Sequence, residues 1–365
     1  MRSASNRVPK QEIHADDTAL LLYTGGTTGT AKGAVLTHKN IVANAIQARA
    51  WMTDVEDGKE VIMTALPLFH SYGMTACHHF AVLCKSAMVL VPKFEPLRVM
   101  KEINRVKVTI FPGVPTMYVA VNNHPNVDKY NLESVRLCIS GGAALPRDVQ
   151  QTFERITGAR LVEGYGLSEC SPVTHCNPMK GGGKSGSIGL PWPNTNAKIV
   201  DQKTGDTLRA GAIGELAVRG PQVMKCYWKN EKETEDAFKK EWLLTGDMGK
   251  MDEDGYFFVV DRKKDMIVSG GFNIYPREIE DVLCEHPKVS EVAVIGIPDD
   301  YFGESVKAFI VLQNGVDVKP DDIQQFCKGK LAKYKIPKEI SFREELPKSL
   351  IGKVLRRVLV EEEQV

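Results

Sequence analysis

Glycines, threonines and one lysine near the start of the chain have the residue types of a phosphate-binding loop. The apolar run Leu20–Tyr23 is followed by Thr24, Gly25, Gly26, Thr27, Thr28 and Gly29, and then by Lys32. Glycine lets backbone N–H groups approach an anion, threonine hydroxyls donate hydrogen bonds, and lysine adds a positive charge. We therefore predict a buried strand that ends in a polyphosphate cradle.

The residues beside Lys32 exclude a Walker loop. That loop has glycine directly before its lysine and serine or threonine directly after it, whereas Ala31 and Gly33 flank Lys32. An ordinary turn between a strand and a helix stays the alternative. Thr37 is a typical N-cap for a helix from about His38 to Trp51, which would place a second anion-friendly helix end nearby.

Charged residues that could act on a nucleotide or a metal ion recur further along the chain. Glu169 offers a hard oxygen ligand for Mg²⁺, with a solvent-facing glutamate as the alternative. Asp247 in Thr245-Gly246-Asp247, considered alone, is more often a turn residue than a ligand. Lys353 lies in a basic segment that could equally be a solvated face.

The elements that position these residues follow the pattern of an α/β fold. Apolar strand-like runs alternate with helical patterns, which argues for a doubly wound, mostly parallel sheet. Strands are predicted at 61–66, 87–91, 108–111 and 135–140, and helices at 96–105, 115–122 and 146–157. Ligands of such sheets bind in loops beyond the carboxyl ends of the strands, where Ser140–Ala144 and Glu163–Glu169 are placed.

The second half of the chain predicts a small β-rich subdomain and then an α+β domain. Gly181–Gly186 matches G-x-G-x-x-G but follows a polar loop, so we interpret it as a flexible loop and not as a dinucleotide site. Short strands are expected at 197–200, 214–219 and 256–260. Beyond the charged break Asp261–Asp265 we expect helices at 276–285 and 320–331, strands at 291–297 and 306–312, and a solvated tail at 361–365.

The composition is ordinary for a globular protein. The chain has 365 residues, 43% of them hydrophobic and 25% charged, and a net charge of +1. This charge gives no argument for nucleic acid as a partner. The eight cysteines form no C-x-x-C pair, so we expect no zinc site or disulfide framework and a cytoplasmic location. Met1–Arg7 does not open a signal peptide, and prolines, glycines and histidines within Val61–Cys84 argue against a membrane span.

Taken together, the motifs resemble the adenylate-forming superfamily of acyl-CoA synthetases, adenylation domains and luciferases. The resemblance runs from about Asp17 to Val358, with the motifs in the family's order and spacing. Tyr23–Ala34, Asp261–Met266 and Leu346–Lys353 look most like bacterial-type long-chain fatty acid–CoA ligases. The resemblance implies an acid–thiol ligase that converts a fatty acid, ATP and coenzyme A to acyl-CoA, AMP and pyrophosphate, with Mg²⁺ as cofactor.

The resemblance also implies roles for individual residues. Lys353 would act in adenylation, with Glu169, Lys32 and His70 also in catalytic positions. Glu169 and Thr28 would bind Mg²⁺, and Gly271 would let the pantetheine of coenzyme A pass. The expected nucleotide- and cofactor-binding residues are Thr24, Gly25, Gly26, Thr27, Thr28, Gly29, Lys32, Gly141, Gly142, Ala143, Gly164, Tyr165, Gly166, Ser168, Asp247, Arg262, Lys264 and Gly271.

The same resemblance implies two domains. Residues 1–261 would form the adenylation core, with its β-rich part at about 181–261, and 262–365 a mobile C-terminal domain with a hinge at about 261–265. The acyl pocket would be walled by the largely apolar segments 67–74, 113–118 and 164–172. These favour a fatty or aryl acid over an amino acid, so an aryl-acid ligase stays an alternative. A peripheral membrane contact and a homodimer also stay open.

Two features depart from the family pattern. The family carries a substantial portion before the Thr/Gly loop, which here begins at Tyr23, so we expect a truncated core with uncovered apolar surface and a tendency to associate. A nucleotide-binding fragment without turnover is therefore a further alternative. Cys226 stands where the family usually has glycine, and if that turn needs a positive φ, Cys226→Gly should stabilise the chain.

Overall fold

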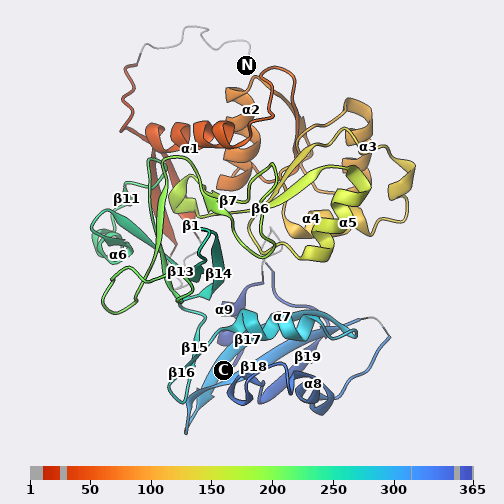
Figure 1. Cartoon of the computed structure of the whole chain (residues 1–365), viewed down its shortest axis with the longest axis vertical. Coiled ribbons are helices and arrows are strands. Elements are labelled where there is room, and N and C mark those ends of the chain that lie inside the picture. The colour runs from red at the N-terminus through yellow and green to blue at the C-terminus, as the bar shows by residue number, and fades with distance from the viewer. Residues whose placement is uncertain (1–10, 25–30, 314, 349–353, 364–365) are drawn as a thin grey trace, which may run out of the picture.

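The computed structural model describes residues 11–24, 31–313, 315–348 and 354–363. A larger upper lobe contains the elements up to β14, and a smaller lower lobe contains β15 and all later elements (Figure 1). The expected fold, a large α/β domain followed by a smaller α+β domain, is confirmed.

The centre of the upper lobe is a mainly parallel sheet. Strand β3 (Val61–Thr64) pairs in parallel with β4 (Ala87–Leu90), and β5 (Leu137–Ser140) with β6 (Arg160–Gly166). Ile110 joins the two pairs through single parallel bridges to Ile62 and Leu137, so the strand expected at 108–111 is reduced to one bridging residue. The sheet continues antiparallel through β7 (Val173–Cys176) and β8 (Leu190–Pro191).

Helices alternate with these strands as the sequence predicts. They are η1, a π-helix (Gly73–His79), α2 (Phe80–Leu83), α3 (Pro96–Val106), α4 (Pro115–Asn122), η2 (Val127–Lys129), α5 (Arg147–Thr157) and η3 (Ser168–Cys170). The core between sheet and helices includes Phe111, Tyr118 and Phe153, whose rings contact one another. The buried hydroxyl of Tyr118 donates to the carbonyl oxygens of Phe111 and Ile139, at 2.8 and 3.0 Å. These bonds fix the loop after Ile110 against β5.

The phosphate-loop candidate joins two antiparallel strands. Strand β1 (Thr18–Thr24) pairs with β2 (Lys32–Thr37), which pairs with β11 (Cys226–Tyr227). The expectation that Leu20–Tyr23 is a buried strand is wrong, because β1 is an edge strand and the ring of Tyr23 is exposed. The helix prediction is confirmed in α1 (His38–Trp51), whose N-cap Thr37 forms a capping box with Asn40.

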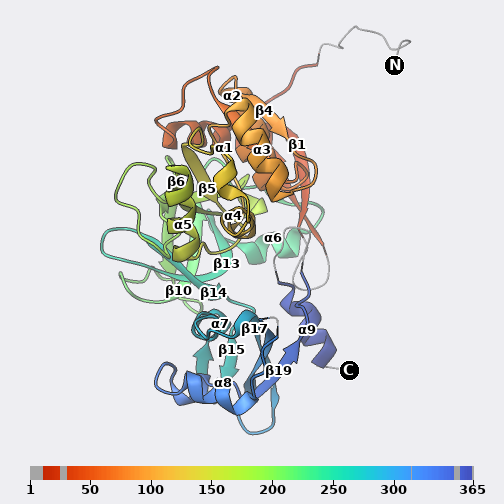
Figure 2. The same ribbon diagram turned by 90° about the vertical axis from the view of Figure 1, so that its right-hand side faces the viewer.

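An antiparallel sheet forms the β-rich part. Its order is β12 (Phe238–Lys239), β13 (Trp242–Met251), β10 (Gly214–Arg219) and β9 (Asn196–Val200), and β14 (Phe257–Arg262) pairs with β13. The sheet lies between the upper helices and the lower lobe (Figure 2). A short helix that the sequence reading missed, α6 (Glu231–Ala237), follows β11. Gly181–Gly186 is a loop, as expected.

The lower lobe has its own sheet and core. It contains β15 (Ile267–Ser269), β16 (Phe272–Ile274), α7 (Pro276–Cys284), β17 (Val289–Asp299), β18 (Gly303–Leu312), α8 (Pro320–Cys327), η4 (Lys333–Lys335), β19 (Glu339–Arg343) and α9 (Arg356–Glu363). Of the solvated tail expected at 361–365, Glu361 and Glu362 are exposed as predicted, but residues 361–363 are helical. They end α9, where Leu359 is fully buried and Glu363 pairs with Lys307 at 2.5 Å.

Ion pairs and hydrogen bonds connect the two lobes near the predicted hinge. Arg277 of α7 donates its backbone N–H to Asp261 of β14 at 2.7 Å. Arg356 pairs with Glu280 of α7 at 2.6 Å and with Asp265 at 3.2 Å. The charged break at 261–265 therefore lies within a network of paired charges.

Apolar side chains remain exposed on the outer faces of α1 and α2. Val42, Ile46 and Val82 are each more than half exposed. Within the described residues, no helix has the length and apolar character needed to cross a membrane.

The expectation for Cys226 is wrong. This residue lies in β11 and is absent from the positive-φ positions of the described chain, so its side chain imposes no turn strain.

Candidate functional site

A tyrosine, an aspartate and an arginine from three separate strands meet at the junction of the two sheets. Tyr165 at the end of β6 donates its hydroxyl hydrogen bond to Oδ2 of Asp247 in β13. Nε of Arg262 in β14 lies 2.7 Å from Oδ1 of the same carboxylate. The register of β13 and β14 places Asp247 opposite Arg262. Tyr165 comes from β6, in the neighbouring sheet, and reaches Asp247 with its hydroxyl. We call Tyr165, Asp247 and Arg262 the nucleoside triad, after the role that the sequence predicts for them.

The charges of the nucleoside triad stabilise one another. Burial lowers the pKa of Arg262, but the charge of Asp247, together with those of Tyr165, Asp265 and Glu169, raises the pKa above its usual value. Burial and the charge of Asp247 raise the pKa of Tyr165, which keeps its hydroxyl a donor. His175 contacts the tyrosine ring edge-on, with ring centroids 6.0 Å apart. The triad is therefore pre-organised.

Glycines in the neighbouring loops allow close packing against Pro172 and Tyr72. A Cβ on Gly166 would lie 2.1 Å from the carbonyl oxygen of Pro172, and one on Gly141 would lie 3.1 Å from the ring of Tyr72. Gly142 has a φ of +82°, a conformation that side chains disfavour. With Ala143 and Gly164, these residues lie at the carboxyl ends of β5 and β6, where the sequence reading placed a ligand.

A buried carboxyl group supports this glycine loop from behind. Glu163 in β6 accepts the backbone N–H of Leu145 at 3.1 Å. Burial raises the pKa of Glu163 to about 7, while that hydrogen bond and the charge of Arg277 act in the opposite direction. The sequence reading did not single out this role, which depends on the neighbouring strand.

A second group of polar residues surrounds Lys32. Its ammonium group forms an ion pair with Glu233 of α6 and lies 5.5 Å from the centroid of the Tyr227 ring. The hydroxyl of Tyr227 donates to Oε1 of Glu169 at 2.8 Å. Burial and the charge of Glu169 raise the pKa of Tyr227, so its hydroxyl stays protonated. We call Lys32, Glu169, Tyr227 and Glu233 the lysine cluster.

Several predicted site residues lie outside the described part of the chain. These are Gly25, Gly26, Thr27, Thr28 and Gly29 of the Thr/Gly loop, and Lys353. At the margin of that loop, the hydroxyl of Thr24 donates to the carbonyl oxygen of Lys32 at 3.4 Å. Ser168 begins η3, one residue before Glu169.

His70 lies on the β3 side of the glycine loops. Its Nδ1 accepts the backbone N–H of Tyr72 at 3.1 Å, and the hydroxyl of Tyr72 donates to the carbonyl oxygen of Ile139 at 2.6 Å. Burial lowers the pKa of His70, which keeps its imidazole neutral near pH 7. The histidine is therefore positioned by the same tyrosine that packs against Gly141.

The two predicted residues of the lower lobe differ in their distance from the nucleoside triad. Lys264 follows Arg262 by two residues, and burial lowers its pKa while the charge of Asp265 acts in the opposite direction. Gly271, with a φ of +84°, lies in the turn between β15 and β16. The β15–β16 hairpin lies in the lower lobe, whereas the strands of the triad, β6, β13 and β14, lie in the upper lobe (Figure 1).

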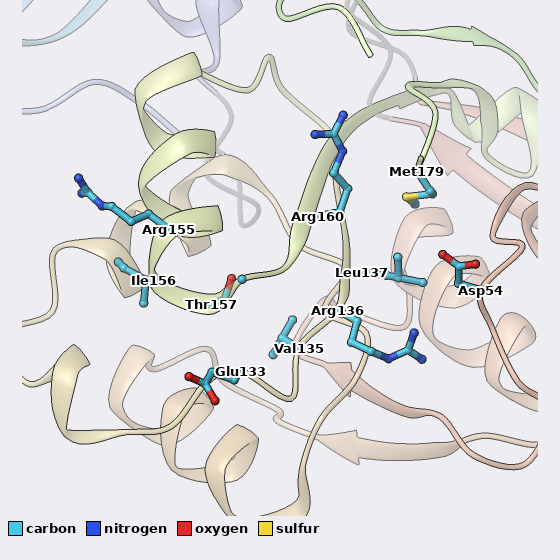
Figure 3. A pocket seen from close by; sticks show the side chains of 11 residues that line it. Asp54, Glu133, Val135, Arg136, Leu137, Arg155, Ile156, Thr157, Arg160 and Met179 are labelled. Atoms are coloured by element: carbon cyan, nitrogen blue, oxygen red, sulfur yellow. The ribbon is translucent and has the colours of Figure 1, made fainter. Parts of the chain in front are cut away.

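A hollow of about 560 Å³ lies at the opposite ends of β5 and β6 from the glycine loops. Its lining includes Arg136, Arg155 and Arg160. Figure 3 shows the guanidinium groups of Arg155 and Arg160 pointing in different directions, and no residue of the triad or the lysine cluster lines the hollow. We assign no ligand to it, because its charges do not converge.

The sequence reading missed the partners of Lys32. Tyr227 was considered only as a neighbour of Cys226, and Glu233 was not considered. The signal available was Asn230, a typical N-cap that accepts the backbone N–H of Glu233 at 3.2 Å. Sequence alone could place the start of α6 but not its contact with a residue about 200 positions earlier.

Comparisons with known proteins match both parts of the chain. Residues 2–228 match the family model described as AMP-binding enzyme, and residues 278–353 match that of the AMP-binding enzyme C-terminal domain. A long-chain-fatty-acid–CoA ligase of Bacillus subtilis (strain 168) is 51% identical over 347 residues, which are 95% of this chain and 62% of the ligase. The chain therefore spans less than two thirds of that relative's length.

Solved structures with similar folds include MatB and MenE. ATP-bound MatB from Rhodopseudomonas palustris has a TM-score of 0.92 at 34% identity, covering 99% of this chain and 71% of MatB, whereas apo MatB has a TM-score of 0.75 at the same identity and coverage. The o-succinylbenzoate CoA synthetase MenE of Bacillus subtilis, in complex with its acyl-adenylate intermediate, has a TM-score of 0.85 at 34% identity, covering 95% of this chain and 70% of MenE.

Proposed function

Since this chain belongs to the AMP-binding enzyme family, we propose that it acts as an ATP-dependent fatty acid–CoA ligase. The carboxylate oxygen of the acid attacks the α-phosphorus of ATP, and the bond to pyrophosphate breaks. The sulfur of coenzyme A then attacks the acyl carbon, and AMP leaves. The observation that carries this proposal is the nucleoside triad. Its members come together although Asp247 and Arg262 follow Tyr165 by 82 and 97 residues in the sequence.

We assign the nucleoside end of ATP to the triad and the glycine loops. The ring of Tyr165 would stack on adenine beside Gly141, Gly142 and Ala143. Asp247 would accept hydrogen bonds from the ribose hydroxyls, as carboxylates commonly do. Arg262 supports this role because its guanidinium group pairs with Oδ1 of Asp247 and holds the carboxylate in place.

The lysine cluster would receive the phosphates. Lys32 provides a point charge at the margin of the Thr/Gly loop, where Thr24, Gly25, Gly26, Thr27, Thr28, Gly29 and Ser168 are the proposed neighbours. Glu169 fits a Mg²⁺ ligand, because its carboxylate is partly exposed and Oε2 accepts no hydrogen bond from a described residue. Bound there with Thr28 as second ligand, Mg²⁺ would supply positive charge that offsets the charge of the phosphates.

The lower lobe would complete the reaction. Lys353 would offset charge as it develops at the α-phosphorus, because electrostatic stabilisation dominates phosphoryl transfer. The higher TM-score to ATP-bound than to apo MatB supports an arrangement suited to this first step. Rotation about 261–265, with Lys264 in the hinge, would later present Gly271 to coenzyme A. The separation of the β15–β16 hairpin from the strands of the triad is consistent with a lobe that has not rotated (Figure 1).

The acid would bind on the His70 side of the glycine loops. Its proposed walls, 67–74, 113–118 and 164–172, contain the buried Tyr72, Val114, Met117 and Tyr118. A neutral His70 can donate a hydrogen bond to the substrate carboxylate without neutralising the nucleophile. The apolar walls and the 51% identical long-chain ligase favour a medium- or long-chain acid.

Acid-dependent exchange of labelled pyrophosphate into ATP tests this proposal. We expect exchange with fatty acids, measured over a panel of chain lengths with aromatic acids in parallel. Exchange confined to aromatic acids would replace the substrate class. Nucleotide binding without exchange for any acid would refute catalysis by this chain.

A further inference from the structure

In the lysine cluster, the carboxylate of Glu233 forms an ion pair with the ammonium group of Lys32, which we expect to bind phosphate. Lys32 and Glu233 form an ion pair in which the lysine side chain is 18% exposed and the glutamate side chain 35% exposed. The pair is therefore shielded from solvent on the lysine side. A polyphosphate can reach the full charge of Lys32 only after Glu233 has moved away from it.

The backbone around Glu233 is fixed to the strand that carries Tyr227. The side chain of Asn230 accepts the N–H of Glu233, and Oγ1 of Thr234 accepts the N–H of Tyr227 at 2.9 Å. The hydroxyl of Thr234 also donates to the carbonyl oxygen of Asn230 at 2.8 Å. The glutamate therefore starts from a defined position beside Lys32, and only its side chain has to turn.

We propose that Glu233 competes with the β- and γ-phosphates of ATP for Lys32 and thereby sets the affinity of the site for polyphosphates. The inference rests on the proposed function. Its carboxylate weakens ATP binding in two ways, by pairing with Lys32 and by repelling the phosphates. The same competition favours departure of pyrophosphate, because Glu233 can pair again with Lys32 as the product leaves. Glu233 is thus a positioning residue that acts through Lys32.

The test compares ligands that differ in phosphate content. Binding of ATP, pyrophosphate and AMP to Glu233→Gln is measured by calorimetry at one fixed excess of Mg²⁺. Loss of a partly exposed ion pair and of one repulsive charge should lower the Kd for ATP and pyrophosphate about three- to tenfold. The Kd for AMP should stay unchanged, because AMP has no β- or γ-phosphate.

The same helix offers a matched control. Glu235 is exposed and has no described partner, so Glu235→Gln makes the same charge change on α6 without freeing Lys32. We expect its Kd values to match those of the unsubstituted chain. Glu233→Asp keeps the charge but shortens the side chain, so it should give an intermediate gain and checks that folding is unimpaired. In the double variant with Lys32→Ala, the part of the gain that comes from freeing Lys32 should be lost, and only the smaller part that comes from the lost repulsion should remain.

Three results would overturn the inference. They are weaker ATP and pyrophosphate binding in Glu233→Gln, an equal gain for AMP, or an equal gain in Glu235→Gln. Failure of the proposed function has a different signature, because tighter polyphosphate binding without acid-dependent exchange would refute the ligase activity and retain the competition at Lys32. A chain that binds no ATP at all would refute both.

Discussion

The nucleoside triad and the lysine cluster differ in what their charges already contact. In the triad, Asp247, Arg262 and Tyr165 contact one another, and we propose that all three serve the nucleoside. In the lysine cluster, Lys32 pairs with Glu233, a group that a phosphate would have to replace. The triad is therefore arranged before its proposed ligand binds, whereas Lys32 of the lysine cluster is paired with a competing residue of the same chain.

This difference has an energetic consequence for ATP. A pre-organised site loses little conformational entropy when it binds, whereas a self-paired site must break an interaction first. We therefore expect adenosine to supply most of the binding free energy. The phosphates would be held less tightly, which suits a reaction that releases pyrophosphate and retains AMP as acyl-adenylate.

The largest effect should come from a residue that belongs to neither group. Lys353→Ala should slow adenylation about 100- to 1,000-fold, the range seen when one electrostatic contact to a developing charge is removed. ATP and AMP binding should change little, because both binding groups remain intact. Acid-dependent pyrophosphate exchange measures the first step, and thioester formation from supplied acyl-adenylate and coenzyme A measures the second. Equal loss of both steps would contradict the assigned role.

Asp247→Ala should separate the two groups by ligand. Two lost hydrogen bonds to a carboxylate, at about 1.5 kcal/mol each, predict an increase in Kd of about 100-fold, by the same factor for AMP and ATP. Lys32→Ala should instead weaken ATP and leave AMP unchanged. Calorimetry with both nucleotides checks this, with exposed Asp236 replaced by alanine as control. If Asp247→Ala weakened ATP alone, the assignment of the two ends would be wrong.

Glu163→Gln tests whether the glycine loop beside the triad makes the stability of the fold depend on pH. Because burial raises the pKa of Glu163 to about 7 in the folded chain from 4.5, its stabilising contribution is complete below pH 4.5 and is lost as the pH rises through 7. Glutamine carries no charge and can still accept the N–H of Leu145. The variant should therefore gain stability over the unsubstituted chain between pH 5 and pH 8, by at most about 3 kcal/mol.

Thermal unfolding at pH 5 and pH 8 measures the gain of Glu163→Gln. Glu133→Gln is the control, since Glu133 is exposed. A Tm difference that is the same at both pH values would show that Glu163 does not titrate between them.

Local sequence patterns predicted the elements well, and contacts between distant segments were harder to predict. Helix α1 was predicted over its full extent, because the N-cap Thr37 is a local signal that needs no contact with distant residues. The burial of Leu20–Tyr23 was misjudged, because exposure depends on β1 being at an edge. The triad residues were identified only through the family motifs, since spacing alone cannot show that Tyr165 reaches Asp247. Glu233 had no motif and needed the folded chain.

Cys226→Gly should give the smallest effect and tests how firmly the lysine cluster is held. Cys226 is paired with Val35 in the short strand β11 and needs no positive φ. Glycine in a strand costs about 0.5–1 kcal/mol in conformational entropy, so this variant should lower Tm, in contrast to the expectation from the family pattern. Because Tyr227 is the next residue in β11, a looser strand should also weaken ATP binding slightly and leave AMP binding unchanged. Cys226→Ala keeps a Cβ and should retain most of the stability, so a higher Tm for glycine than for alanine would show that the backbone at position 226 favours glycine after all.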